Sequence, residues 1–209
     1  MTVEKIFYWL AWVFFRVFFT VYNRLSIKWL EPLPSDGNVI VACNHCSNLD
    51  PLVAGVAFPR RLRYFAKEEL FRPLLFGSAI RILGAVPVSR ADNAAAAGAL
   101  RGFLKLLKEG NDVLIFPEGS RSPDGTLQPL EGGAGLIAAH AKASILPVFL
   151  KGTYRAMKPG AVLVRPAKIS VTFGKLLVFD PEICTEKGAR EKIMAELTKS
   201  LHELESAAS

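Results

Sequence analysis

Short apolar runs recur along the chain, separated by longer stretches in which apolar residues have helical spacing. Three runs, at residues 39–43, 113–116 and 144–150, consist almost entirely of β-branched and other apolar residues. Continuous runs of this length are typical of strands that are buried on both faces of a sheet. At 91–109 and 186–205 the apolar residues recur three or four positions apart, as in amphipathic helices. The pattern therefore predicts an α/β fold, with a central mixed sheet flanked by helices.

Weaker patterns predict further strands. Residues 60–70 read as a strand that runs into a polar turn, and residues 162–164 and 169–173 alternate or run apolar. Residues 83–90 contain a proline, which restricts this short strand to an edge or a bulge because proline cannot donate a ladder hydrogen bond. In such a fold we expect the functional side chains in the loops that leave the strand ends.

A dense aromatic segment precedes this pattern. Residues 6–22 hold nine aromatic residues and carry Arg16 near the middle. As a helix they would span ~25 Å, short of a ~30 Å hydrocarbon core, and Arg16 would cost ~2.5 to 3.5 kcal/mol at its centre. We therefore expect a helix that lies in or dips into one leaflet; the alternative is a helix packed on the domain's own core. A turn-rich joint then divides the chain into a membrane-interface segment, 1–31, and a catalytic domain, 32–209.

Composition adds limits to this picture. With 209 residues, 51% of them hydrophobic, the chain can build one sizeable core. Its net charge of +7 suits a nucleic acid, an anionic lipid surface or a phosphorylated substrate, and composition does not choose among these. The odd number of cysteines, three, favours a reduced cytosolic environment over a disulfide framework.

Two of the cysteines, Cys43 and Cys46, form a C-x-x-C pair. A structural zinc site would need two more ligands, and the candidates Cys184, His140 and His202 are not arranged as a second pair. A redox pair is disfavoured because Cys43 lies within a strand pattern rather than at a helix start. We therefore expect no metal site.

The first apolar run stops at a polar cluster that contains His45 and Asp50. On a regular α-helix residues at this spacing lie ~140° apart around the axis, so the two side chains meet only if the chain turns. Ser47 and Asn48 favour such a turn, and Asp50 before Pro51 reads as a helix N-cap. One oxygen of Asp50 is then expected to cap the helix while the other holds the imidazole of His45. Such a histidine is suited to take a proton from a hydroxyl or water; the alternative is a pair that only satisfies a loop.

The second apolar run ends in another polar cluster. Pro117 breaks the strand pattern, and Gly119 allows a tight turn that exposes Ser120 and Arg121. Arg121 can bind a phosphate through two parallel hydrogen bonds, which a lysine cannot. Glu118 is expected to accept a hydrogen bond from a substrate hydroxyl or to hold Arg121 in place, with a plain ion pair as the alternative.

Together, residues 44–50 and 116–122 resemble the first and third signature blocks of the glycerolipid acyltransferases, specifically the 1-acyl-sn-glycerol-3-phosphate acyltransferase family. The two blocks stand in this order and about 70 residues apart. The resemblance covers about residues 30–175. It implies a glycerolphosphate-acyltransferase-like fold, with His45 and Asp50 as the catalytic pair.

Further positions extend the resemblance. Lys67 matches a lysine that follows the catalytic histidine in the family and approaches the substrate phosphate, and Arg90 stands at the basic position of the second block. Residues 144–150 resemble the fourth block, around Pro147, which is implied to line an acyl pocket. One position departs from the family: Glu131 stands where a lysine is usual. The chain is therefore expected to hold a phosphate with Lys67, Arg90 and Arg121, or to accept a different headgroup.

The resemblance implies transfer of a fatty acyl group from a thioester to the sn-2 hydroxyl of 1-acyl-glycerol-3-phosphate, giving phosphatidic acid. His45 would be the general base, oriented by Asp50, and Gly119 and Ser120 would bind substrate together with Glu118 and Arg121. The implied partners are lysophosphatidic acid, acyl-CoA or acyl carrier protein, and a membrane lipid surface at the cytoplasmic face, with no cofactor, metal or nucleic acid. The alternatives are acylation of another lysophospholipid or of glycerol 3-phosphate, and a non-catalytic membrane-binding adaptor.

Overall fold

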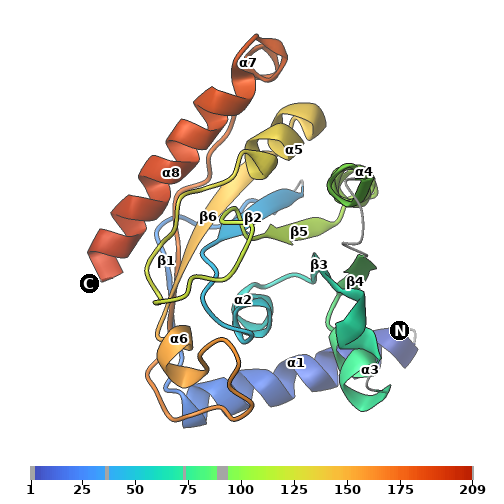
Figure 1. Ribbon diagram of the computed structural model, residues 1–209, viewed down its shortest axis with the longest axis vertical. Coiled ribbons are helices and arrows are strands. Elements are labelled where there is room, and N and C mark those ends of the chain that lie inside the picture. Colours follow the sequence, from blue (N-terminus) through green and yellow to red (C-terminus); the bar gives the residue numbers. More distant parts are fainter. Residues whose placement is uncertain (1–2, 36–37, 73, 89–93, 209) are drawn as a thin grey trace.

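Strand β2 (Val39–Cys43) lies in the middle of the sheet in the computed structural model (Figure 1). The structure describes residues 3–35, 38–72, 74–88 and 94–208, and over these residues the sheet has seven strands. All of β2 is buried: Val39, Val41 and Cys43 face one hydrophobic core, while Ile40 and Ala42 face the other. This two-sided burial is the reason that the strand is a continuous apolar run.

The strands follow the order β1-β7-β6-β2-β5-β3-β4. Strands β6, β2, β5, β3 and β4 run parallel, whereas β7 is antiparallel to β6 and parallel to β1. The loops that leave the ends of β2, β5 and β3 therefore emerge at one edge of the sheet. The remaining strands are β1 (Ser26–Trp29), β3 (Leu62–Lys67), β4 (Ala85–Val88), β5 (Asp112–Ile115), β6 (Ser144–Lys151) and β7 (Ser170–Phe173).

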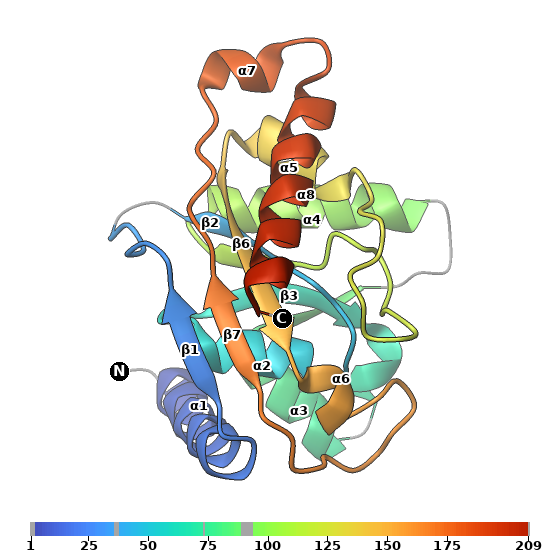
Figure 2. The ribbon, with the colours of Figure 1, turned by 90° about the vertical axis from the view of Figure 1, so that its left-hand side faces the viewer.

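Helices cover both faces of the sheet (Figures 1 and 2). The core on one face includes residues of α1 (Val3–Tyr22), α2 (Asp50–Ala57) and α3 (Leu74–Ile82). The other core includes residues of α4 (Ala94–Lys108), α5 (Gly133–Ala141) and α8 (Ala189–Ala208), whose predicted apolar stripe is buried. The short helices are η1 (Glu68–Phe71), α6 (Thr153–Ala156) and α7 (Pro181–Thr185). The predicted α/β class, a mixed sheet flanked by helices, is confirmed.

Two local predictions differ from the structure. Residues 162–164 are not a strand, because they lie in an exposed loop bounded by Pro159 and Pro166. Strand β1, which the sequence pattern did not predict, lies before the predicted boundary at residue 31 and pairs with β7. The predicted edge position of the proline-containing strand is confirmed, since β4 ends the sheet order beside β3.

Helix α1 packs along the domain with one face and leaves the other face exposed. Tyr8 and Phe19 are buried, and Arg16 turns inward, where its Nη1 donates to the carbonyl of Val56 at the end of α2 (2.9 Å). Among the described residues, one helix, at Lys5–Tyr22, is long and apolar enough to cross a membrane by length and composition. Its exposed apolar side chains are Ile6, Phe7, Trp9, Leu10, Val13, Phe14, Val17, Val21 and Tyr22. Arg16 and the buried aromatics thus face the protein, as the packed-helix alternative expects, while an apolar face remains exposed, and the expected contact of this face with a leaflet stays a prediction.

Candidate active site

The predicted contact between His45 and Asp50 is present. His45 lies in the turn that joins β2 to α2, Asp50 is the first residue of α2, and His45 Nδ1 is 2.9 Å from Asp50 Oδ2. The Asp50 side chain is fully buried, whereas 18% of the His45 side chain is exposed. Since a carboxylate only accepts hydrogen bonds, Nδ1 carries the proton of this contact. The tautomer of His45 is therefore fixed with its free lone pair on Nε2.

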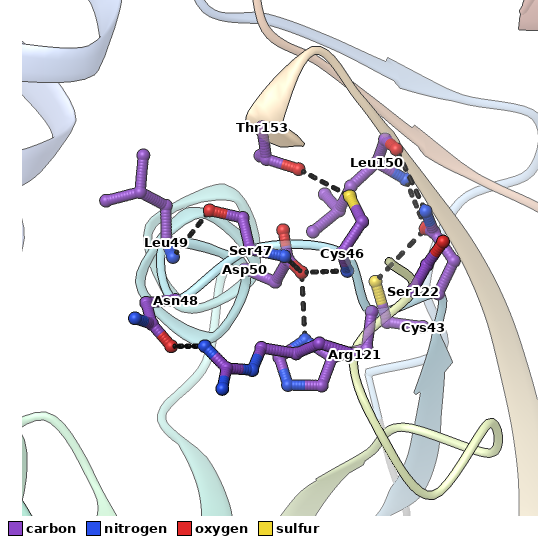
Figure 3. A network of polar contacts seen from close by, with 12 residues as sticks. Cys43, Cys46, Ser47, Asn48, Leu49, Asp50, Arg121, Ser122, Leu150 and Thr153 are labelled. Atoms are coloured by element: carbon purple, nitrogen blue, oxygen red, sulfur yellow. Dashed lines mark hydrogen bonds and ion pairs between the residues drawn. The ribbon is translucent and has the colours of Figure 1, made fainter. Parts of the chain in front are cut away.

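Asp50 organises the whole turn through one oxygen (Figure 3). Besides the imidazole, Oδ2 accepts hydrogen bonds from the backbone N–H groups of Cys46 and Ser47, both at 2.7 Å. The expected helix-capping role of Asp50 is wrong: Leu49 is the N-cap of α2, and no side chain caps this helix. The physical reason is position, because Asp50 is itself the first residue of α2, one residue past the N-cap. Its Oδ2 points back to the N–H groups of Cys46 and Ser47, while Oδ1 is buried without a hydrogen-bond partner within the ranges that the structure describes.

The remaining surroundings of His45 hold it without blocking Nε2. The ring of Phe116 stacks on the imidazole, with 4.0 Å between centroids and 21° between planes. The backbone of His45 is bound on both sides, because its N–H donates to Glu118 Oε1 and its carbonyl accepts from the N–H of Ser122 (2.7 Å). Within the described part of the chain, Nε2 makes no hydrogen bond. It is thus free to accept a proton from an incoming hydroxyl.

Glu118 joins the two loops of the site. Its side chain is buried, and its Oε2 accepts from the N–H of Gln128 (2.8 Å) while Oε1 takes the N–H of His45. Burial raises the pKa of the Glu118 carboxyl, because water cannot solvate its charge there. Across the described ranges Glu118 forms no ion pair with Arg121, so the ion-pair alternative is wrong. In the structure, Glu118 links the backbone of His45 to that of Gln128. Its contact with a substrate hydroxyl stays a prediction.

Arg121 lies beside the His45 turn. Its Nη1 donates to Asn48 Oδ1 (2.6 Å), and both side chains are exposed (Figure 3). Gly119 has a φ of +69°, which lets the chain turn sharply before the exposed Ser120. The turn therefore brings an exposed guanidinium next to the loop that carries His45, and the role of Arg121 in holding a phosphate stays a prediction.

Of the two other predicted basic residues, the structure describes Lys67 alone. Lys67 is exposed at the end of β3, at the same edge of the sheet as the loops after β2 and β5. In the described ranges it makes no ion pair with the site. Arg90 lies outside the described residues. Their roles in binding a phosphate stay predictions.

Some residues that shape the site were not found from the sequence. Asn44 is buried, and its side-chain amide forms two hydrogen bonds with the backbone of Leu150. Nδ2 donates to the carbonyl of Leu150 (3.0 Å), and Oδ1 accepts from its N–H (2.7 Å), so the amide pairs with β6 as a neighbouring strand would. These bonds fix the start of the His45 turn to the end of β6. In the sequence, Asn44 stands directly before His45 and Phe116 directly before Pro117. These positions were the available signals that both residues belong to the site.

Cys46 lies close to His45 and Asp50, but its thiol is not set up to react. Its side chain is buried, with Sγ 3.2 Å from Thr153 Oγ1. Burial and the negative charge of Asp50 raise the pKa of the Cys46 thiol to about 12. A thiol with this pKa stays protonated near neutral pH, so it is not an effective nucleophile. No group of three or more His, Cys, Asp or Glu side chains suited to a metal occurs among the described residues.

Replacing Cys46 with Ser should therefore leave activity within about threefold of wild type, a change below roughly 0.7 kcal/mol in activation free energy. The backbone N–H that Cys46 gives to Asp50 is unaffected, and a hydroxyl can replace the thiol beside Thr153. Steady-state kinetics on the purified variant provide the measurement. An acyl group trapped on Cys46, detected by mass spectrometry of the intact protein, would contradict this expectation.

The geometry defines a class of enzyme. A histidine with a free Nε2, oriented by a buried aspartate and placed beside an exposed arginine, can activate a hydroxyl group of an anionic acceptor for attack on an acyl group. The Acyltransferase family model matches residues 24–151, which include β1 and the whole site. The chain belongs to this acyltransferase family.

Known relatives agree with this class. A chloroplastic 1-acyl-sn-glycerol-3-phosphate acyltransferase of Arabidopsis thaliana is 33% identical over 141 residues, which are 67% of this chain and 39% of that protein. The 1-acyl-sn-glycerol-3-phosphate acyltransferase of Bacillus subtilis is 34% identical over 158 residues, which are 75% of this chain and 72% of that protein. The crystal structure of the 1-acyl-sn-glycerophosphate acyltransferase from Thermotoga maritima matches with a TM-score of 0.75 and 27% identity, covering 97% of this chain and 81% of that chain.

Proposed function

We propose that this protein transfers a fatty acyl group from a thioester to the sn-2 hydroxyl of 1-acyl-glycerol-3-phosphate, giving phosphatidic acid. The observation that carries the proposal is the free Nε2 of His45, held by Asp50 and placed one loop away from Arg121. The names of the relatives support the choice of acceptor. This pair of features serves acyl transfer, whereas a membrane adaptor would need neither.

In the proposed reaction, Nε2 of His45 takes the proton of the acceptor hydroxyl as its oxygen attacks the thioester carbon. The resulting tetrahedral intermediate collapses with cleavage of the carbon–sulfur bond, and the imidazolium returns its proton to the departing sulfur. Because a thiol has a pKa of ~8.5, the thiolate leaves without strong acid assistance. The Asp50 carboxylate and the face of the Phe116 ring both stabilise the transient positive charge on His45. These steps require no metal and no bound cofactor.

The membrane supplies the acceptor in this proposal. Lysophosphatidic acid and phosphatidic acid are both membrane lipids, and the exposed face of α1 offers apolar and aromatic side chains to a leaflet. We place the protein as a monotopic enzyme at the cytoplasmic face, where acyl-CoA or acyl carrier protein brings the donor thioester from the aqueous side.

We further propose that Arg121, with Lys67 and Arg90, holds the acceptor phosphate. Arg121→Lys should then raise the KM for the acceptor about tenfold or more while leaving the donor KM nearly unchanged. The lysine keeps the charge but loses the paired geometry, and a charge-assisted hydrogen bond is worth ~1.5 to 3 kcal/mol. Arg101→Lys, on the exposed side of α4, is the matched control and should behave as wild type. Unchanged acceptor KM and kcat would refute the assignment, and a donor-side defect would move Arg121 to the thioester carrier.

A second acceptor class has one observation in its favour. The Glu131 carboxyl packs against Gly119, so close that a Cβ built on this glycine would lie 2.4 Å from Glu131 Cδ. A negative charge therefore lies next to the loop that carries Arg121, which favours an acceptor with less phosphate charge. Incubating the protein with labelled acyl thioester and separate lysolipids decides between the two. Our proposal expects phosphatidic acid as the main product, and faster acylation of a zwitterionic lysolipid would favour the second candidate.

A further inference from the structure

The loop between α6 and β7, residues 157–168, exposes an apolar tip. Val162 is 87% exposed and Leu163 is 77% exposed, which are the highest values among the large apolar side chains that the structure describes. Exposing such side chains to water is unfavourable, so a tip of this kind indicates a surface that is covered in use. The contacts and charges around the tip indicate which surface covers it.

Hydrogen bonds to neighbouring elements hold the 157–168 loop in place. The N–H of Arg165 donates to the carbonyl of Ala156 (2.8 Å). The fully buried Asn23, just after α1, donates through Nδ2 to the carbonyls of Arg165 (3.0 Å) and Ala167 (3.1 Å). The hydroxyl of Tyr22 donates to the carbonyl of Val164 (3.2 Å). The apolar tip is therefore fixed to the C-terminal end of α1.

Charge around the tip has one sign. Four exposed basic side chains flank it, and residues 151–170 contain no Asp or Glu: the four are Arg155, Lys158, Arg165 and Lys168. Apolar side chains surrounded by basic ones match a bilayer that carries anionic headgroups, since the apolar groups enter the acyl region while the cations stay at the headgroups.

The loop and α1 also lie at the same end of the molecule, opposite α7, in both views (Figures 1 and 2). The loop additionally reaches the active site, because Ser47 Oγ donates to the carbonyl of Met157 (2.7 Å). A surface that covers α1 at this end would therefore meet the loop tip, and the tip is coupled to the turn that carries His45.

We propose that the 157–168 loop is a second membrane contact, in which Val162 and Leu163 enter an anionic leaflet beside the apolar face of α1. Two separated contacts fix the tilt of the domain on the bilayer, whereas α1 alone would leave it free to roll about the helix axis. The active-site turn is thereby kept at a constant position relative to the lipid surface. This inference rests on the membrane role proposed for α1.

A fluorescent probe tests the insertion directly. The variant Leu163→Cys is labelled with an environment-sensitive nitrobenzoxadiazole group, which is selective because the three native cysteines are buried. On phosphatidylcholine vesicles that contain phosphatidylglycerol, its emission should shift to the blue and be quenched by nitroxide-labelled acyl chains. Val178→Cys, 71% exposed and near α7, is the matched control and should show neither change. A probe at position 163 that stays in water while the protein is bound would overturn the inference.

Binding measurements separate this inference from the role of α1. Val162→Ser/Leu163→Ser should weaken vesicle partitioning about tenfold or more, given the apolar area of the two side chains. Lys158→Glu/Arg165→Glu should abolish the preference for phosphatidylglycerol, and Val178→Ser should change nothing. Phe14→Ser on α1 is the reference variant. If Phe14→Ser weakens binding and both loop variants do not, the loop inference fails alone; if the wild-type protein does not partition at all, the membrane role of α1 fails as well.

Discussion

His45→Ala should lower kcat by about 10² to 10⁴, the usual contribution of a single general base. Among the described residues of the turn, His45 alone combines partial exposure with a free ring nitrogen, and the buried Asp50 cannot reach a substrate in its place. The fold should survive, because the Asp50 carboxylate keeps its two backbone donors, Cys46 and Ser47. The measurement is kcat on lysophosphatidic acid with a saturating acyl thioester, together with thermal unfolding of both proteins.

His202→Ala is the matched control for this experiment. His202 is a surface residue of α8 whose side chain is 59% exposed, and its removal should leave kcat and stability unchanged. Near wild-type kcat in His45→Ala would show that another group takes the proton, and the proposed mechanism would be abandoned.

Asp50→Asn should reduce kcat almost as strongly as His45→Ala. One oxygen, Oδ2, accepts from the imidazole and from both N–H groups of the turn. An amide oxygen in its place keeps these bonds but lacks the negative charge that supports the imidazolium, and an NH₂ group in its place would face Nδ1 and favour the tautomer with the proton on Nε2. The variant loses the anionic partner of three hydrogen bonds, so unfolding free energy should also fall by about 1.5 to 3 kcal/mol. Both quantities are measurable, by kinetics and by denaturant unfolding.

The surface carboxylate Asp180 provides the control, since it is exposed and makes no capping bond at α7. Asp180→Asn should leave kcat and unfolding free energy as in wild type. If Asp50→Asn lost stability but kept its kcat, Asp50 would be a structural residue of the turn and not the orienting partner of His45.

The central strands could be predicted because each is buried on both sides. A residue run such as 39–43 has to be apolar at every position when successive side chains enter two different cores. The same reasoning found α8 from a single apolar stripe. It failed at 162–164, where Val162 and Leu163 are exposed, because the apolar pattern of so short a run does not tell a buried strand from an exposed loop. Strand β1 was missed because it has only four residues and begins soon after a long apolar helix, at Ser26 after a helix that ends at Tyr22.

The contacts of the site could be predicted only where they join residues that are close in the sequence. The turn between His45 and Asp50 is formed by neighbouring residues, and its residue types indicated the contact. The bond from the N–H of His45 to Glu118 joins residues 73 positions apart and depends on β5 lying next to β2, which no pattern in the sequence states. The error about Asp50 as a helix cap has a related origin, since α2 begins at Asp50 itself, and the N–H groups of Cys46 and Ser47 that its Oδ2 binds come together only in the folded turn.

The central claim is that the acceptor hydroxyl, activated by His45, attacks the thioester directly. Its most direct test is thiol release from an acyl thioester, followed with the protein at a concentration comparable to the thioester. Without lysophosphatidic acid we predict no burst of thiol; when the acceptor is added, thiol and phosphatidic acid should form in equal amounts, and His45→Ala should suppress both. A burst of one thiol per protein before the acceptor is added, with the acyl group retained on the chain, would contradict the account.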